Sequence, residues 1–184
     1  SAAVYGNQQG SLSESNFPIP INHYGNSKLV MENMAKNYFE KLNILIVRPF
    51  NYTGVGQENH FLIPKIISHY ASRKKTIELG NIEVFREYND INDIARAYYK
   101  LLIEDFHSQT LNLCSGRSYS ISQILDILNK KVNYNIKVTV NPKFVRKNEI
   151  SDLKGDPSKL YHWLGNDHFQ MTIEETLSKM LNIP

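Results

Sequence analysis

Cysteine is nearly absent from this chain: Cys114 is the single one among 184 residues. One cysteine cannot form an internal disulfide, so nothing ties the protein to an oxidising compartment, and we expect a cytoplasmic location. Long apolar runs are also missing, because the longest unbroken one covers only residues 44–47. A run of that length is too short for a membrane span or for the core of a signal peptide. The sequence therefore predicts no association with a membrane.

The sequence also lacks a large excess of charge of either sign, because 21 Lys and Arg against 18 Asp and Glu leave a formal net charge of +3. Nucleic-acid-binding proteins concentrate basic residues on one face, whereas the short basic clusters at 73–75 and 130–131 stand apart. The six histidines, His162 and His168 among them, show no spacing typical of a metal site. The Gly-x-Ser-x-Gly motif of many hydrolases does not occur in the sequence, so nothing indicates a hydrolase. We therefore expect no nucleic acid and no metal.

The apolar residues that are present, 41% of the chain, follow alternating helical and extended patterns. Helices are expected at 22–41, 61–72, 91–103, 120–128 with Ser120 as the cap, 157–164 and 173–181. Strands are expected at 44–47, 76–79, 84–88, 111–113 and 136–140, with a strand end at 1–6 and an unpacked connection at 10–20. A helix followed by a continuous β-branched strand is typical of a parallel α/β sheet.

The strongest chemical signal is the pair Tyr24 and Lys28, four residues apart on one face of the first long helix. A cation beside a phenol stabilises the phenolate, which suits a group that exchanges a proton with an alcohol or a carbonyl. The spacing alone is common, and its ordinary interpretation is a surface lysine beside a half-buried tyrosine.

The order of several further segments changes that interpretation. They are residues 1–6, 20–28, 47–51, 80–98, 112–116, 145–149 and 155–159. In this order, and over nearly the whole chain, the sequence resembles the extended short-chain dehydrogenase/reductase family, whose members modify nucleotide-linked sugars. The resemblance implies an α/β fold: the C-terminal part of a Rossmann-like parallel sheet, plus a smaller α/β substrate-binding lobe.

The resemblance also implies roles for residues near the reacting sugar. Tyr24 would exchange the proton at the sugar hydroxyl or keto group, and Lys28 would hold the nicotinamide ribose of NAD or NADP. Ser1 matches the residue that hydrogen-bonds the reacting oxygen, and Asn51 matches an Asn beside the substrate. Lys65 is a weaker candidate for the nucleotide base pocket.

Three more residues are implied in binding the nucleotide. Arg86 and Arg146 match arginines that grip the diphosphate, in keeping with the preference of a guanidinium for paired phosphate oxygens. Glu149 would accept hydrogen bonds from the nucleotide ribose. The alternative to diphosphate binding, for each arginine, is a surface ion pair with Glu87 or Asp152 as partner.

One part of the family pattern is missing. No Gly-x-Gly-x-x-Gly or Gly-x-x-Gly-x-x-Gly motif occurs in the chain, although pyrophosphate binding at the first helix of a Rossmann fold needs one. We therefore expect residues 1–184 to form the catalytic edge and nucleotide-sugar-binding part of a longer enzyme, with the dinucleotide-binding half absent and no turnover by this part alone.

The residues after Ser1 narrow the reaction. The family's 4,6-dehydratases carry acidic residues there, whereas this chain has Ala2 and Ala3, which cannot carry a proton. The segments around Asn51 and Glu149 look most like reductases of GDP-4-keto-6-deoxymannose, so we expect reduction of a 4-keto-6-deoxy nucleotide sugar, with GDP favoured. A nucleotide-sugar 4-epimerase is the alternative, and a 4,6-dehydratase or a non-catalytic sugar-nucleotide-binding module comes next. By resemblance, the complete enzyme would be a homodimer that pairs through the Tyr24 helix.

Overall fold

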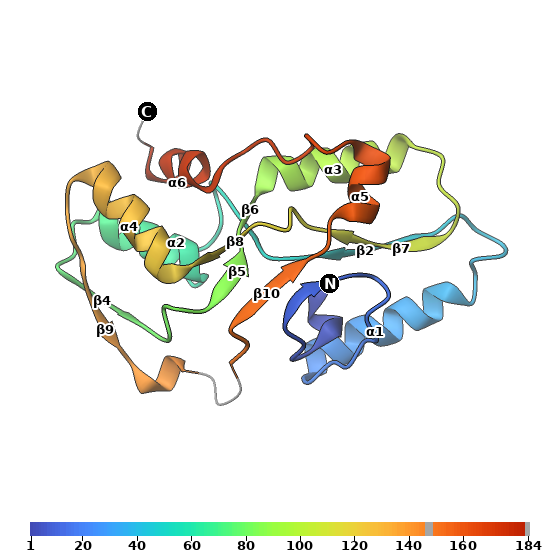
Figure 1. Ribbon diagram of the computed structural model, residues 1–184, viewed down its shortest axis with the longest axis horizontal. Helices are drawn as coiled ribbons and strands as arrows, with labels where there is room; N and C mark the ends of the chain where they lie inside the picture. The colour runs from blue at the N-terminus through green and yellow to red at the C-terminus, as the bar shows by residue number, and fades with distance from the viewer. Residues whose placement is uncertain (146–148, 183–184) are drawn as a thin grey trace.

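The computed structural model describes residues 1–145 and 149–182 (Figure 1). The helices are α1 (His23–Lys36), α2 (Leu62–Ala71), α3 (Ile91–Ile103), α4 (Ile121–Val132), α5 (Ser158–Leu164) and α6 (Ile173–Leu181), with 3-10 helices η1 (Ala2–Tyr5) and η2 (Pro142–Phe144). The strands are β1 (Gly10–Leu12), β2 (Leu45–Pro49), β3 (Tyr52–Thr53), β4 (Thr76–Leu79), β5 (Phe85–Glu87), β6 (Asn89–Asp90), β7 (Gln109–Leu113), β8 (Ser118–Ser120), β9 (Lys137–Val140) and β10 (Asp152–Gly155).

The parallel pair β2–β7 forms one half of the molecule, with α1 on one side and α3 and α5 on the other (Figure 1). Leu111 and Leu113 of β7 are fully buried and pack in one core cluster with Ala97 of α3 and Leu160 of α5. Helices on both sides explain why residues 45–47 of β2 form a continuous apolar run. The expected α/β class, with a parallel Rossmann-like sheet, is confirmed.

A second core fills the other half, where α2, α4 and α6 lie together beside the parallel pair β4–β9 (Figure 1). Ile66, Ile124, Leu128 and Leu177 are almost fully buried in it. As expected, Ser120 caps α4, within a capping box completed by its third helical residue. This half forms the smaller α/β lobe.

A four-stranded sheet in the order β1-β10-β5-β8 lies between these halves. β1, β10 and β5 run parallel, and β8 is antiparallel to β5. The approach of β10 to its neighbours requires Gly155, because a Cβ there would lie 2.5 Å from Cys114 Sγ and 2.7 Å from the Phe50 ring. Strand β10 pairs with β1 from the N-terminal part of the chain and with β5 from its middle.

Buried polar contacts attach the segment between α5 and α6 to α3. The Asp93 carboxylate accepts hydrogen bonds from the Met171 backbone N–H (2.9 Å) and from the Arg96 guanidinium, which also donates to the His168 carbonyl oxygen (2.8 Å). His168 itself is 2% exposed and its Nε2 lies 3.1 Å from the Asp93 carbonyl oxygen. This part of the chain is therefore held by polar contacts as well as by packing.

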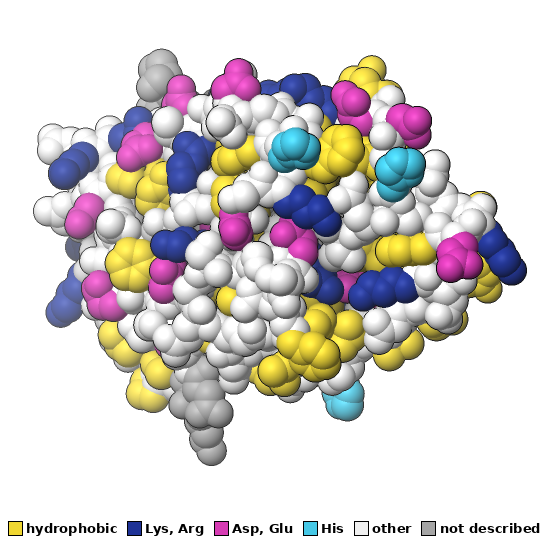
Figure 2. All heavy atoms as spheres, turned by 45° about the vertical axis from the view of Figure 1, so that its right-hand side comes forward, with side chains coloured by type: hydrophobic (Ala, Val, Ile, Leu, Met, Phe, Trp, Pro, Cys, Tyr) yellow, Lys and Arg dark blue, Asp and Glu magenta, His cyan; other side chains and the backbone are white. Residues whose placement is uncertain are grey.

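Within the described residues, no helix is both long and apolar enough to cross a membrane. The face shown in Figure 2 carries basic and acidic side chains interspersed, with no concentrated basic stripe on that side.

Three local expectations were wrong. Residues 2–5 form the 3-10 turn η1 instead of a strand end, because the Ser1 side chain accepts a hydrogen bond from the Ala3 N–H and starts a helical turn. The segment 10–20 contains the packed strand β1, with Leu12 buried. Helix α1 ends at Lys36, and residues 37–42 continue as turns instead of helix.

Candidate functional site

Helix α1 presents Tyr24 and Lys28 on one face. Its first turn is capped by Asn22, whose side-chain oxygen accepts the Gly25 N–H at 2.8 Å. The Lys28 Nζ lies 5.5 Å from the centroid of the Tyr24 ring, and the tyrosine side chain is 57% exposed. The phenol and the ammonium are therefore adjacent and open to a ligand, as the spacing predicts.

Turn η1 lies directly against this part of α1. A Cβ on Gly25 would meet the Ala3 carbonyl oxygen at 2.7 Å, so the two backbones are in contact one residue after Tyr24. The Ser1 nitrogen donates to the Val47 carbonyl oxygen of β2 at 3.4 Å. The fold thus holds Ser1 against β2, at the start of the turn that contacts the tyrosine helix. The proposed roles of these side chains stay predictions.

Asn51 follows β2 at its carboxyl end, where open α/β sheets bind ligands. Its carbonyl oxygen accepts two hydrogen bonds from Asn89, from the backbone N–H at 3.1 Å and from Nδ2 at 3.2 Å, while its own side chain is exposed. This contact links the end of β2 to the segment that follows β5.

The residues expected to bind the nucleotide lie towards the smaller lobe. Arg86 on β5 donates to the Phe85 carbonyl oxygen at 2.7 Å and pairs with Leu153 of β10. Glu149 lies just before β10, and its Oε2 is buried with no hydrogen-bond partner among the described residues. Arg146 lies outside the described residues. Their roles in holding a nucleotide stay predictions.

Lys65, on α2, lies deeper in the smaller lobe. Its Nζ donates to the Glu78 carbonyl oxygen at 2.8 Å and lies 4.7 Å from the centroid of the Phe144 ring. Because Phe144 belongs to η2, these contacts attach α2 to the segment that leads to Glu149.

Sequence reasoning missed the buried carboxylate of Glu87, which is 1% exposed and so is no surface partner for Arg86. Its oxygens accept from the Gly155 N–H (2.6 Å), Asn89 Nδ2 (2.8 Å) and both the N–H and the hydroxyl of Ser115 (2.9 and 3.3 Å). Burial raises the pKa of this carboxyl group, an effect that these donors oppose. Glu87 thereby joins the ends of β7 and β10 to β5.

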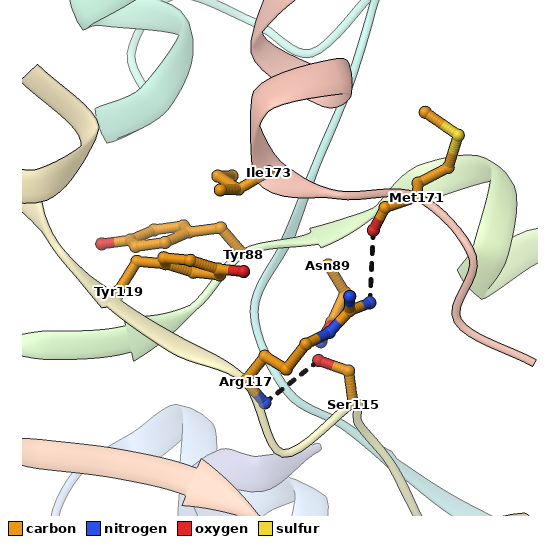
Figure 3. Close-up of a pocket in the computed structure, with 7 residues that line it drawn as sticks. All are labelled: Tyr88, Asn89, Ser115, Arg117, Tyr119, Met171 and Ile173. Atoms are coloured by element: carbon orange, nitrogen blue, oxygen red, sulfur yellow. Dashed lines mark hydrogen bonds between the residues drawn. The ribbon is translucent and has the colours of Figure 1, made fainter. Parts of the chain in front are cut away.

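A small crevice lined in part by Asn89 and Ser115, two of the Glu87 donors, contains none of the expected site residues. Figure 3 shows its lining by Tyr88, Asn89, Ser115, Arg117, Tyr119, Met171 and Ile173. The Arg117 guanidinium is occupied there by the carbonyl oxygens of Phe169 and Met171, at 3.1 and 3.2 Å. We interpret this crevice as a structural contact and not as a binding site, because the Arg117 guanidinium already holds the segment that leads into α6.

Within residues 1–145 and 149–182, no group of three or more His, Cys, Asp and Glu side chains is arranged to hold a metal ion.

Known proteins match this chain in sequence over nearly its whole length. The family profile described as GDP-mannose 4,6 dehydratase matches residues 1–180. GDP-6-deoxy-D-talose 4-dehydrogenase of Aggregatibacter actinomycetemcomitans is 39% identical over 180 residues, which make up 97% of this chain and 61% of that protein. GDP-6-deoxy-D-mannose reductase of Pseudomonas aeruginosa is 27% identical over 191 residues, covering 96% of this chain and 62% of that protein.

Solved structures agree in fold. A proposed epimerase from Burkholderia cenocepacia J2315 superposes with a TM-score of 0.93 at 42% identity, covering 99% of this chain and 60% of that one. RMD from Pseudomonas aeruginosa, complexed with NADPH, superposes with a TM-score of 0.89 at 26% identity, covering 99% of this chain and 63% of that one. The chain thus spans about three fifths of the length of these relatives. The match over residues 1–180 shows that it belongs to the GDP-mannose 4,6-dehydratase family of extended short-chain dehydrogenases/reductases, as its motifs indicate.

Proposed function

We propose that this chain carries the proton-transfer site and the nucleotide-sugar lobe of an NAD(P)-dependent enzyme that reduces a 4-keto-6-deoxy nucleotide sugar. The observation that carries the proposal is the exposed Tyr24 phenol with the Lys28 ammonium 5.5 Å from its ring centroid, on the part of α1 that contacts η1. The dinucleotide-binding part would lie in the additional length that the relatives have.

The residues present fit a nicotinamide cofactor at this edge, because a lysine ammonium donates well to ribose hydroxyls and Lys28 lies beside the phenol. A bound cofactor supplies the hydride. Tyr24 gives its phenolic proton to the sugar oxygen as that oxygen becomes negative, and Lys28 stabilises the resulting phenolate. Ser1 orients the same oxygen by a hydrogen bond.

The nucleotide would lie across β5 and the start of β10. Arg86 offers a guanidinium to the diphosphate. The buried Oε2 of Glu149, which has no hydrogen-bond partner within residues 1–145 and 149–182, is an acceptor for a ribose hydroxyl. The names of the two curated relatives support GDP as the nucleotide. We assign Arg146 and Lys65 to the same lobe, at the diphosphate and near the base.

Ala2 and Ala3 favour simple reduction over dehydration within this family, because expelling water from the sugar needs an acid and a base at those positions. Epimerisation at C4 uses the same tyrosine and no further acid, and a UDP-glucose 4-epimerase of Halalkalibacterium halodurans is 26% identical. Epimerisation is therefore the second candidate.

Three assays on a chain that includes a dinucleotide-binding segment test the reaction. GDP-4-keto-6-deoxymannose with NADPH or NADH should oxidise the cofactor stoichiometrically. Interconversion of C4 isomers without net cofactor change would favour the epimerase instead. A 4-keto-6-deoxy product formed from GDP-mannose and NAD would contradict the argument from Ala2 and Ala3. The first assay counts as negative only after UDP, CDP and dTDP sugars have also failed.

Tyr24→Phe tests the site itself. The ring and its packing are kept while the proton donor is removed, so turnover should fall by roughly 10²-fold or more with folding intact. Tyr38→Phe, at another exposed tyrosine beyond the end of α1, is the matched control and should leave turnover unchanged. Near-normal turnover of Tyr24→Phe would refute the assignment.

A homodimer formed through α1 is part of the proposal. Val30, Met31 and Met34 on this helix are each more than half exposed, and burying them against a second copy would be favourable. Sedimentation equilibrium of the complete enzyme tests this arrangement.

A further inference from the structure

Helix α1 is attached to the rest of the chain through few residues. Of its 14 residues, Gly25 and Glu32 are buried, while Tyr24 and most of its other side chains are exposed or half-exposed. Gly25 is a backbone contact with η1 and fixes one point near Tyr24. Leu29 packs against the core cluster that contains Val4 and Tyr5, and such an apolar contact sets no fixed angle. The buried carboxylate of Glu32, which makes directional hydrogen bonds, therefore sets the rotation of the helix about its axis.

Glu32 is held by Arg48 of β2 in a two-pronged ion pair. Arg48 Nε lies 3.0 and 3.2 Å from the two carboxylate oxygens, and Nη2 lies 2.7 Å from Oε2. Both side chains are nearly inaccessible, at 2% and 1% exposed. Two parallel hydrogen bonds between planar groups constrain both distance and angle, which a single contact to a lysine would not.

The ion pair continues into a chain of buried hydrogen bonds. Arg48 Nη1 donates to the Tyr5 hydroxyl at 3.0 Å, and that hydroxyl donates to Asn112 Oδ1 at 2.7 Å. Asn112 Nδ2 in turn donates to the Leu12 carbonyl oxygen at 2.8 Å. The network therefore ties α1 to β2, to the end of η1, to β7 and to β1.

These elements carry the proposed site. Tyr24, Lys28 and Glu32 follow one another at intervals of four residues, so they share one helix face and turn together. Arg48 precedes Asn51 on the same strand end, and Tyr5 follows Ser1 in η1. A change in the Glu32–Arg48 geometry is thereby a change in where the Tyr24 phenol and the Lys28 ammonium lie.

We propose that Glu32 and Arg48 are positioning residues, whose bidentate pair fixes the rotation of α1 and so the placement of Tyr24 and Lys28 towards the reacting sugar oxygen. This inference rests on the proposed function of Tyr24. Buried ion pairs add little to stability compared with apolar packing, but they can specify one arrangement. A displacement of about 1 Å in a reacting group costs roughly 10²-fold in rate.

The test compares variants in the complete enzyme. Arg48→Lys keeps the charge and removes the fork, and we expect kcat to fall roughly tenfold or more while KM for the nucleotide sugar stays within about twofold. Arg96→Lys is the same substitution at an arginine of α3 that pairs with the buried Asp93 and is itself 37% exposed, and it should leave kcat within about twofold. If Arg48→Lys unfolds, the double variant Glu32→Leu/Arg48→Met decides, because it leaves no unpaired buried charge, and it should show the same loss of kcat.

A readout independent of turnover separates this inference from the proposed function. Hydrogen–deuterium exchange at residues 24–32 should be faster in Arg48→Lys and unchanged in Arg96→Lys. Unchanged kcat and unchanged exchange in Arg48→Lys and in the double variant would overturn the positioning role even if Tyr24→Phe is inactive. Normal turnover of Tyr24→Phe, with faster exchange in Arg48→Lys, would instead refute the proposed function and leave the pair a purely structural contact.

Discussion

Two buried ionisable residues, Glu87 and His168, hold their surroundings together by different means. Glu87 is surrounded by donors, so its carboxylate organises three segments although burial raises its pKa. His168 donates from Nε2 to the Asp93 carbonyl oxygen, but its Nδ1 is buried with no partner among the described residues. The imidazole is therefore suited to its neutral form, and protonation would place an unpaired charge inside the protein.

Acid should weaken the protein through His168. Burial lowers the pKa of this histidine, the Asp93 carbonyl opposes that shift, and the charges of Arg96 and Lys100 add to it. The unfolded chain therefore binds a proton more readily, so this contribution to stability is complete above about pH 6.5 and falls as the pH decreases towards the lowered pKa. His168→Gln can still donate to Asp93 and does not titrate.

Thermal unfolding between pH 5 and 8 measures the effect. The melting temperature of the wild type should drop more steeply below pH 6.5 than that of His168→Gln. His162→Gln, at an exposed histidine nearby in the sequence, is the control and should follow the wild type. Parallel curves for wild type and His168→Gln would show that His168 contributes nothing to acid sensitivity.

At the scale of elements, contact between α1 and η1 depends on the missing side chain of Gly25. A Cβ at this position would lie 2.7 Å from the Ala3 carbonyl oxygen and 2.9 Å from Pro20 Cβ. Both neighbours belong to the backbone or to a rigid ring, so neither can rotate away. The close approach of helix and turn therefore excludes every other side chain unless α1 moves.

Gly25→Ala should for this reason lower stability and kcat, although alanine favours a helix interior over glycine by about 1 kcal/mol. The added methyl group must push α1 away from η1 and so carry Tyr24 away from Ser1. Ser27→Ala, at an exposed position of the same turn, is the control and should raise the melting temperature slightly or leave it unchanged. A stabilised Gly25→Ala with full turnover would show that the contact is not needed.

Elements with a strong apolar period were predictable from the sequence. Helices α2, α3 and α4 and strand β2 lie where the pattern indicates them, because each buries a whole face. Strands β1 and β10 have no such pattern: each is short and mostly polar, and its pairing partner is distant in the sequence. Long-range pairing, not local preference, makes them strands.

The candidate site divides in the same way. Tyr24 and Lys28 are recognisable because their spacing is local. Glu32, Arg48 and Glu87 look like ordinary surface charges in the sequence, since burial depends on the partners that the fold supplies. A buried charge among many exposed ones leaves no local signal, so the network behind the site could be found only in the structure.

At the scale of the whole molecule, the proposed function predicts that this chain binds a GDP-sugar more tightly than it binds NAD or NADP. The 184 residues contain no glycine-rich fingerprint for a pyrophosphate, whereas the lobe around β5 and β10 is present. Calorimetry on this chain should therefore detect a GDP-sugar but only feeble binding of NAD or NADP. Arg86→Ala should weaken GDP-sugar binding about tenfold or more, because a charge-assisted bond contributes roughly 1.5–3 kcal/mol.

The control for that measurement is Arg73→Ala, at an exposed arginine beyond the end of α2, which should bind the GDP-sugar like the wild type. Micromolar affinity of this chain for NAD or NADP would contradict the proposal that the dinucleotide site lies elsewhere. Equal GDP-sugar affinity in Arg86→Ala and the wild type would remove Arg86 from the diphosphate site.

The position of β10 between β1 and β5 has a consequence for the newly made chain. The Ser151 side chain, just before β10, reaches Gln9 across 142 residues of sequence. A ribosome adds about 5–20 residues per second, so β1 waits roughly 7–30 s for the strand that will cover its edge. During that time β5 can already pair with β8, while the edge that β10 will occupy stays open. Translation that stops before residue 152 would therefore release a chain in which β1 and β5 each have an open edge, and these edges could pair with strands of other copies of the chain. This is the stage at which a chaperone would matter most.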